Sequence, residues 1–375
     1  MLSESEQPTT APASGVRPHP TPPGGRRVRA AGAPARPPTD RARSRGFYPV
    51  LAVLSLVLLF LQLTRLSGAD LSTAVSNFSV IFLSIFIEAA PFLLLGTVVS
   101  GLIAAFVRPE QLTRWVPRNP VLASLVGAGA GFVFPVCECG VVPVVRQLYA
   151  KGLSPAVGVT FLLAAPVMNP IVLLSTITAF GFGPMLVGRY VVTLVVAMTA
   201  GLVFAWRARR PGRVPADAQA LLRAPAGPRP GAEGPRPPIA ARLGHALVVA
   251  SDEFFEMGRY LVIGAALAAA LQTLVSPDVL TALGQGPLVS VLTMQGLAFV
   301  LSVCSTVDAF LALTFVGTFS GGSILTFLTF GPMVDIKSLL MFLGVFQRKT
   351  VALLVGLPLG LTLLVGVALN LLRAF

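Results

Sequence analysis

Charged residues are scarce in this sequence. Asp, Glu, Lys and Arg make up 11% of its 375 residues, against about 25% in soluble globular domains. Only two histidines are present, His19 and His245, and neither lies near a cysteine, which argues against a thiol enzyme that uses an imidazole. The sequence also lacks a Walker motif, a dinucleotide-binding fingerprint and a catalytic triad. The chain is therefore not expected to be an enzyme or to hydrolyse ATP itself.

Apolar residues dominate instead, at 54% of the chain, and the mean hydropathy is +0.81. Residues 81–105 contain a single charge, Glu88, and exceed the roughly 20 apolar residues that cross the hydrocarbon core of a bilayer. The alternating segments of a transmembrane β-barrel are absent. The pattern predicts an all-α, polytopic membrane protein with candidate spans at 48–66, 76–107, 121–149, 155–180, 184–206, 245–274, 288–316, 324–346 and 351–372.

The net charge of +13 is concentrated in two segments. Eight arginines lie in residues 1–45 and eight in residues 207–242, next to membrane spans, as the positive-inside rule expects of cytoplasmic segments. Both are rich in Pro, Gly and Ala, so residues 1–46 are predicted to form a disordered cytoplasmic tail and 207–242 a disordered cytoplasmic linker. The tail has no apolar core with a cleavage site, so it is not expected to be a secretory signal peptide. A transmembrane helix is predicted at 47–66.

The positions of these basic segments constrain the membrane topology. Five single crossings between them would place the tail and the linker on opposite sides of the membrane. The segment 121–149 is interrupted by Pro135, Gly140 and Pro143, so we predict that it is a re-entrant hairpin that turns near the midplane. Irregular backbone at that depth must be buried in protein or line a polar cavity. A double crossing with the loop outside is the alternative; it also places both basic segments on one side but needs two short spans.

The two halves of the chain, residues 76–206 and 243–375, resemble each other. Glu88 and Glu256 are 168 residues apart. When one half is shifted along the other by this number, glycines, prolines and carboxylates of the two halves align. The matches are Glu88 with Glu256, Gly96 with Gly264, Gly140 with Asp308 and, after a two-residue gap, Pro166 with Pro332 and Asn169 with Asp335. With the predicted topology, the two repeats are inverted and their broken helices meet near the midplane, as in many secondary transporters.

All three cysteines lie in two short motifs at matching positions of these halves, Cys137-Glu138-Cys139 and Cys304-Ser305-Thr306-Val307-Asp308. Thiols select soft ions such as Cu(I), Zn or a thiophilic metalloid, and three cysteines in apolar surroundings do not make a disulfide framework. We predict a substrate site built from Cys137, Cys139, Cys304, Ser305 and Asn169. The alternative is that each cysteine packs as a small hydrophobe. No resident metal or cofactor is predicted.

Five carboxylates within apolar segments are candidates for proton or ion coupling: Glu138, Asp308, Asp335, Glu88 and Glu256. Local pairs offer a structural alternative, because Arg259 could neutralise Glu256 and Lys337 could neutralise Asp335. Prolines free backbone carbonyls, and helix breaks are predicted at Pro135, Gly140, Pro143, Pro166 and Pro332. Asn169 and Asp335 beside these breaks could instead act as helix caps.

Four strings carry a resemblance to a known family: FPVCECGVVPVVRQLYAKG, FLLAAPVMNP, CSTVDAFLA and FLTFGPMVDIKSLLMF. They resemble sequences of the predicted-permease family that contains the ArsP-type organoarsenical efflux permeases. The similarity runs from about residue 76 to the C-terminus, without the central linker. The resemblance implies a membrane permease in which Cys137 and Cys139, with Cys304 as a further candidate, recognise a metalloid.

These features predict a multi-pass permease of a bacterial cytoplasmic membrane, with a cytoplasmic N-terminus. It is expected to export a small thiophilic solute, such as a trivalent organoarsenical, with a proton or ion gradient. Its expected partners are the lipid bilayer and a small-molecule or ion substrate, with no nucleic acid, and self-association is left open. Three alternatives remain: a channel or permease for another small ion or solute, the membrane subunit of a larger complex, and a thiol redox protein.

Overall fold

The computed structural model describes residues 71–108, 112, 116–117, 119–134, 137–208, 222, 238–274 and 286–372. By its contacts the chain divides into the units Met1–Gly46 and Phe47–Phe375, and every described residue belongs to the second unit. The predicted basic tail, the predicted helix at 47–66 and most of the predicted linker lie outside the described residues.

The described residues are almost entirely helical and contain no β-strand, only the isolated bridges Leu222–Phe346 and Val316–Phe319. The prediction of an all-α fold is therefore confirmed. The helices in chain order are α2 (Leu71–Phe106), α4 (Pro120–Val133), α5 (Glu138–Ala150), α6 (Pro155–Met168), α7 (Pro170–Phe180), α8 (Pro184–Ala208), α9 (Ile239–Leu274), α11 (Pro287–Leu301), α12 (Asp308–Leu313), α13 (Gly321–Phe330), α14 (Ile336–Val345) and α15 (Arg348–Leu371).

Four of these helices, α2, α8, α9 and α15, are long and apolar enough to cross a membrane. The pair α6 and α7 makes a fifth span if it is counted as one, although it bends by 41° at the break. Four shorter apolar helices, α4, α11, α13 and α14, have 10–17 residues each, too few for a complete crossing of the bilayer. The protein is thus a polytopic α-helical membrane protein that combines full spans with broken ones.

The order of elements occurs twice along the chain. A long helix (α2 or α9) is followed by a first broken pair (α4–α5 or α11–α12), a second broken pair (α6–α7 or α13–α14) and a long helix (α8 or α15). This order matches the two halves recognised in the sequence. The opposite orientation of the two halves across the membrane stays a prediction.

Three helices of the first half begin with a polar residue followed by proline. Asn119, Ser154 and Asn169 each accept a hydrogen bond from a backbone N–H of the first turn through the side-chain oxygen, and proline follows at the next position. The cap supplies an acceptor to an otherwise unpaired N–H, and proline has no N–H that would need one. This chemistry fixes where α4, α6 and α7 start.

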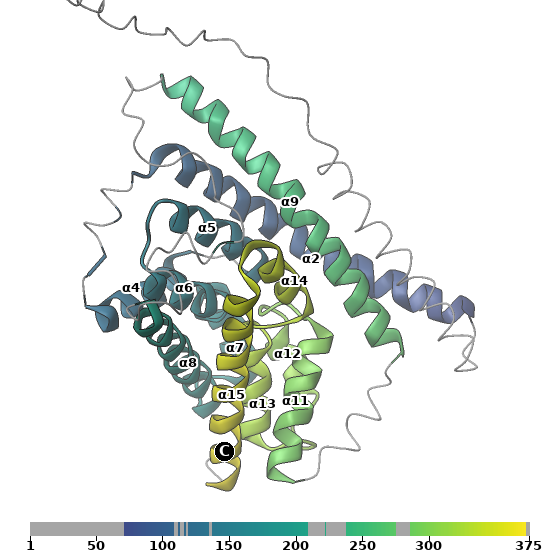
Figure 1. Cartoon of the computed structure of the whole chain (residues 1–375). Coiled ribbons are helices and arrows are strands. Elements are labelled where there is room, and N and C mark those ends of the chain that lie inside the picture. Colours follow the sequence, from purple (N-terminus) through teal and green to yellow (C-terminus); the bar gives the residue numbers. More distant parts are fainter. Residues whose placement is uncertain are drawn as a thin grey trace, which may run out of the picture. The chain divides into compact units, whose positions relative to one another are not determined.

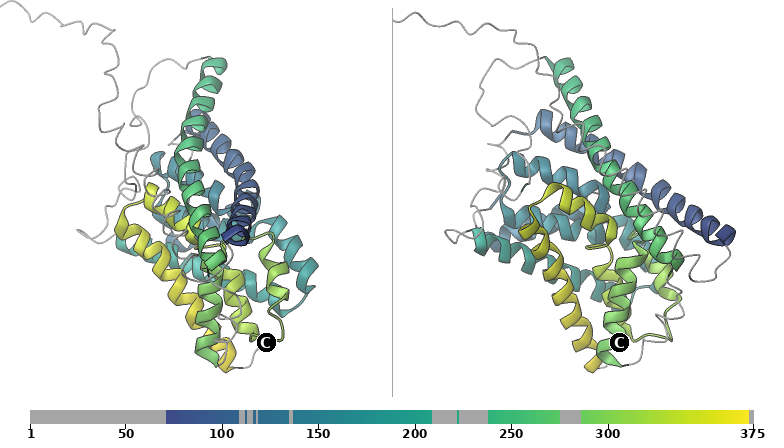
Figure 2. Two further views of the ribbon diagram at one scale, coloured as in Figure 1. Left: turned by 90° about the vertical axis from the view of Figure 1, so that its right-hand side faces the viewer. Right: turned by 45° about the vertical axis from the view of Figure 1, so that its right-hand side comes forward.

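The halves contact each other through their first long helices and through their broken helices. Within the first half α4, α6 and α8 pack together, and α11, α13 and α15 do the same in the second half. Across the halves α5 packs against α14 and α12 against α7, while α9 lies along α2 (Figures 1 and 2). The first broken pair of each half therefore contacts the second broken pair of the other.

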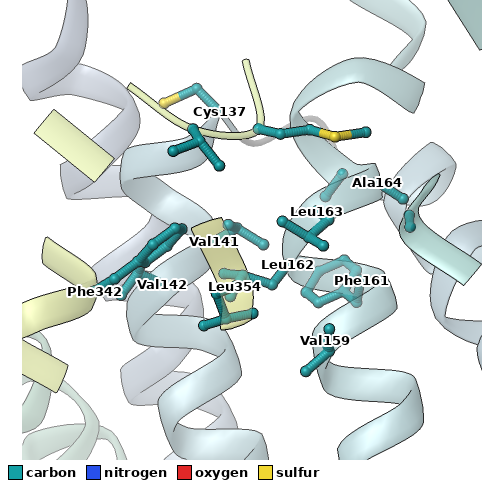
Figure 3. Packing of buried hydrophobic residues seen from close by; sticks show 14 of the residues in the cluster. Cys137, Val141, Val142, Val159, Phe161, Leu162, Leu163, Ala164, Phe342 and Leu354 are labelled. Atoms are coloured by element: carbon teal, nitrogen blue, oxygen red, sulfur yellow. The ribbon is translucent and has the colours of Figure 1, made fainter. Parts of the chain in front are cut away.

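An apolar core surrounds the start of α5. Figure 3 shows Val141 and Val142 of α5 near Leu162 of α6, with Phe342 of α14 and Leu354 of α15 beside them. All five side chains are buried. Residues from both halves thus enclose the segment that carries Cys137, which lies at the edge of this core in the same view.

Candidate functional site

The first cysteine motif lies where α4 ends and α5 begins; residues 137–140 are called the first tip. Cys137 is the N-cap of α5, with no capping hydrogen bond from its side chain, and Glu138 and Cys139 begin the helix. All three side chains are buried. Cys137 and Cys139 are close enough to interact electrostatically.

A buried lysine from the other half meets the first tip. The Nζ of Lys337, on α14, lies 3.5 Å from Oε1 of Glu138 and 3.3 Å from Oδ2 of Asp335. It also donates a hydrogen bond of 2.5 Å to the backbone oxygen of Ser302. Lys337 is close enough to Cys139 and Cys304 to interact with both electrostatically. Glu138 of the first tip therefore forms a three-charge cluster with Asp335 and Lys337 of the other half, with thiols around it.

Two glycines at equivalent positions of the repeat allow this close packing. A side chain at Gly96 of α2 would collide with the backbone of Gly140, and its β-carbon would lie 2.7 Å from the carbonyl carbon there. A β-carbon at Gly264 of α9 would lie 2.9 Å from the α-carbon of Lys337. The matched glycines thus let α2 approach the first tip and α9 approach the lysine that completes it.

The second cysteine motif joins α11 to α12; residues 304–308 are called the second tip. Asp308 begins α12, and its Oδ2 lies 2.6 Å from NH2 of Arg189 on α8. Arg189 is fully buried and also donates from NH1 to Oγ1 of Thr176 on α7, at 2.9 Å. The second tip is thus bound to the first half by an ion pair, as the first tip is bound to the second half.

The loop between α11 and α12 connects the two clusters. Its first residue, Ser302, has the left-handed backbone conformation (φ 49°), which is strained for a residue with a β-carbon. Ser302 contacts Lys337, and its Oγ accepts a hydrogen bond from the backbone N–H of Ile336 at 3.2 Å. Asp308, at the other end of the loop, contacts Arg189. Cys304 lies between these two anchors.

Asn169, a predicted substrate ligand, and Asp335, a predicted coupling residue, have capping roles in this structure. Asn169 Oδ1 accepts hydrogen bonds from the backbone N–H groups of Ile171 and Val172, at 2.7 and 3.2 Å. Asp335 forms a capping box with Ser338 at the start of α14. Asp335 is also paired with Lys337, the neutralisation considered from the sequence.

The predicted positions of the helix breaks need correction. Gly140 and Pro143 lie inside α5, and Pro166 lies inside α6. The first break falls before Glu138, while the second falls at Asn169, where Pro170 starts a new helix. A proline can remain in a helix if the carbonyl that it leaves free can be accommodated. Pro332 lies in the turn between α13 and α14, as predicted, and Pro135 lies outside the described residues.

The predicted carboxylates on the long helices differ in their surroundings. Glu256 is half-buried and lies 2.6 Å from Arg146 NH1 and 3.8 Å from Arg259 NH2. The pair with Arg259 is the local one considered from the sequence. Glu88 is partly buried and lies within electrostatic range of Glu138 and Asp308.

Sequence reasoning missed two polar residues of the buried interior and one ion pair. Arg189 was not singled out, although a fully buried arginine in an apolar helix is unusual. Glu253 is buried beside Ser100, which donates to it, and accepts a hydrogen bond of 2.7 Å from Gln147. The pairing of Glu138 with Lys337 was also missed. Arg189 could have been found from the sequence, because it is a single charged residue within a predicted membrane span.

The thiols are free, and they do not complete a metal site by themselves. Cys137, Cys139 and Cys304 are buried and form no disulfide. Cys304 lies within electrostatic range of Cys137 and Glu138. Among the described residues, no group of three or more His, Cys, Asp and Glu side chains is arranged to hold a metal ion. The arrangement instead offers soft ligands beside a buried ion-pair cluster, between the two halves.

Comparison with known proteins assigns the chain to a family. The family model ArsP_1, described as "Predicted permease", matches residues 74–371. The UPF0718 protein YcgR of Bacillus subtilis (strain 168) is 46% identical over 287 residues, which cover 76% of this chain and 94% of that protein. A Streptococcus mutans serotype c protein, named as a candidate subunit of a two-component membrane permease complex, is 37% identical over 277 residues, 74% of this chain and 89% of that protein. No solved structure matches the chain. The chain belongs to the predicted-permease family that these relatives and the family model define.

Proposed function

We propose that the protein is a secondary transporter that exports a small thiophilic solute, such as a trivalent organoarsenical, across the cytoplasmic membrane. One observation carries the proposal: three buried free thiols lie near a buried three-charge cluster where the two halves meet. Soft ligands bind soft solutes, and ionisable groups at membrane depth mark transport pathways. The family supplies the transport class, and the sequence resemblance to organoarsenical permeases supplies the example of a cargo.

The charge of the three-charge cluster supports coupling to a proton or a monovalent cation. Glu138 and Asp335 contribute two negative charges when ionised, and Lys337 contributes one positive charge. The excess negative charge is costly in a buried cluster unless a cation or a proton neutralises it. Glu138 Oε2 is buried and has no hydrogen-bond partner, so it is the natural position for that proton. At the second tip Arg189 already balances Asp308.

The thiols have the chemistry needed to bind a trivalent arsenical reversibly. With methylarsonous acid, CH₃As(OH)₂, two thiols replace the two hydroxyl groups. Two As–O bonds break, two As–S bonds form, and each thiol proton leaves with a hydroxyl group as water. No oxidant is required and the net charge does not change. Cys137 and Cys139 are one residue apart and interact electrostatically, which suits two sulfur ligands on one arsenic atom.

Export follows from the proposed orientation. The two arginine-rich segments, residues 1–45 and 207–242, belong on the cytoplasmic side by the positive-inside rule. The solute would bind from that side at the junction of the broken helices and leave on the other. Inward proton movement through Glu138 would supply the driving force.

Uptake into everted membrane vesicles tests this function. Cytoplasmic-side transport sites face outward in such vesicles, so an exporter accumulates its substrate inside. We expect vesicles with the protein to accumulate methylarsonous acid when respiration energises them, and a protonophore to abolish the accumulation. A panel with arsenite, Ag⁺, Zn²⁺ and phosphate would define the cargo. Accumulation of phosphate alone would rule out a thiophilic cargo.

A role within a larger complex is the second candidate, because the Streptococcus mutans relative is named as a candidate subunit of a two-component membrane permease complex. The experiment is to reconstitute the purified chain alone in proteoliposomes that carry a proton gradient. Transport by the chain alone supports the single-component transporter. If transport requires a second protein from the native membrane, the subunit role is correct.

A further inference from the structure

The ion pair at the second tip leaves several polar atoms without partners. Arg189 Nε, Asp308 Oδ1 and Ser305 Oγ are buried and make no hydrogen bond. A guanidinium that faces a carboxylate squarely uses two parallel N–H donors, whereas here only NH2 reaches Asp308, at 2.6 Å. The hydroxyl of Tyr190 is also buried without a partner, within electrostatic range of Asp308. A second N–H donor and a second carboxylate oxygen thus remain unused.

Buried polar atoms in native proteins are nearly always hydrogen-bonded, and each exception calls for an explanation. The residues that carry these atoms are neighbours, since NH2 of Arg189 lies 2.6 Å from Oδ2 of Asp308 and 3.5 Å from the backbone oxygen of Ser305. NH1 is held by Thr176 Oγ1, so Thr176 fixes the position of the guanidinium. The clustering of unsatisfied atoms around a positioned guanidinium indicates a place where a ligand supplies the missing partners.

The charges and the hydrogen-bonding groups define the chemistry of that ligand. Arg189 and Asp308 balance each other, so an ion would introduce a net charge into a fully buried cluster. A neutral ligand avoids this cost. It must offer an acceptor to Arg189 Nε and a donor to Asp308 Oδ1, while the Ser305 hydroxyl can take either role. A hydroxyl group provides both a donor and an acceptor.

We propose that Arg189, Ser305 and Asp308 form a binding subsite for the hydroxyl groups of a small neutral solute. Identifying that solute as a trivalent oxyacid such as methylarsonous acid rests on the proposed function. Ser305 directly follows Cys304, and Cys304 lies within electrostatic range of Cys137. The subsite therefore adjoins the thiols and holds the hydroxyl groups of the solute before sulfur replaces them.

Binding to the purified full-length protein in detergent tests the subsite. The measurement is the rise of Tm with ligand concentration, since a ligand that binds only the folded state stabilises it according to its Kd. Three probes distinguish binding through hydroxyl groups from binding to thiols. Methylarsonous acid carries hydroxyl groups and is thiophilic, boric acid carries hydroxyl groups only, and Ag⁺ is thiophilic only. The variants are Ser305→Ala and Arg189→Lys, which retains the charge but has no Nε–H donor.

Ser124→Ala is the matched control, because Ser124 Oγ of α4 is likewise buried without a partner but lies on another helix. We expect Ser305→Ala and Arg189→Lys to weaken binding of methylarsonous acid and boric acid about tenfold, the effect of one lost hydrogen bond to a buried group. Ag⁺ binding should be unchanged in Ser305→Ala, and Ser124→Ala should bind all three probes as the wild type does.

Two results would overturn the subsite: an equal loss of Ag⁺ binding in Ser305→Ala, or unchanged binding of both hydroxylated probes. The proposed cargo is judged separately. If the wild type binds boric acid through Ser305 but neither methylarsonous acid nor Ag⁺, the subsite stands and the thiophilic cargo fails. If Ser305→Ala binds both methylarsonous acid and boric acid as the wild type does, the subsite fails and the cargo stands. Ser305→Ala alone decides the matter if Arg189→Lys does not fold.

Discussion

Replacing Lys337 by methionine removes the charge at the centre of the first tip while keeping a long, flexible side chain. At 3.5 Å between Lys337 Nζ and Glu138 Oε1, Coulomb attraction amounts to about 5 kcal/mol at an effective dielectric constant of about 20. Desolvation of the buried charges offsets part of this attraction. Lys337→Met leaves Glu138 and Asp335 buried without a counter-charge, so we expect the free energy of unfolding to fall by about 3–5 kcal/mol.

A double-mutant cycle separates the interaction from general damage to the core. The free energy of unfolding is measured in mixed detergent micelles for Lys337→Met, Glu138→Gln and the double variant. Because Glu138→Gln removes one of the unpaired charges, the double variant should be more stable than the sum of the single effects predicts, by at least about 1 kcal/mol. Additive effects, within about 0.5 kcal/mol, would refute the direct pairing. Arg259→Gln is the control, because its ion pair with Glu256 is partly exposed and should contribute at most about 1 kcal/mol.

Three further predictions follow from the packing, the charges and the topology. Gly96→Ala should lower the free energy of unfolding by about 1–3 kcal/mol, because its methyl group meets the backbone of the first tip. Gly129→Ala is the control and should not lower it, because nothing lies within 4 Å of a β-carbon there. Equal effects in the two variants would contradict the close approach of α2 and α5. Glu138→Gln and Asp335→Asn should reduce transport and its dependence on pH in vesicles, and wild-type pH profiles in both would exclude these residues from proton coupling. A reporter fused near Pro228 should be cytoplasmic, and a periplasmic signal would overturn the inverted topology.

The sequence predicted the order of the helices well because a chain within the bilayer must satisfy its backbone hydrogen bonds internally, which restricts it to helices and buried breaks. Apolar runs, prolines and glycines located the helices and their interruptions, and the repeat located the matching positions. The exact break points were shifted by a few residues, since Pro143 and Pro166 continue their helices while Asn169 and Pro170 end one and begin the next. Proline marks the neighbourhood of a break, but a capping side chain decides its position.

The partners of the buried charges could not be predicted in the same way. Local pairs such as Glu256 with Arg259 and Asp335 with Lys337 lie within one turn or one cap, and the sequence suggested both. Arg189 and Asp308 are brought together only by the contact of α8 with the second tip. Such a pair depends on how two distant segments pack, and helical periodicity contains no information about that.

The central claim is that the thiols bind the transported solute. The most direct test is a variant in which all three cysteines are changed to serine. Its uptake of methylarsonous acid is measured in everted vesicles. Serine keeps nearly the same size but replaces a soft ligand by a hard one. We predict that the variant inserts normally and loses accumulation, with Cys137→Ser and Cys139→Ser each more harmful than Cys304→Ser. Wild-type accumulation by the triple variant would contradict the account and would leave the cysteines as packing residues.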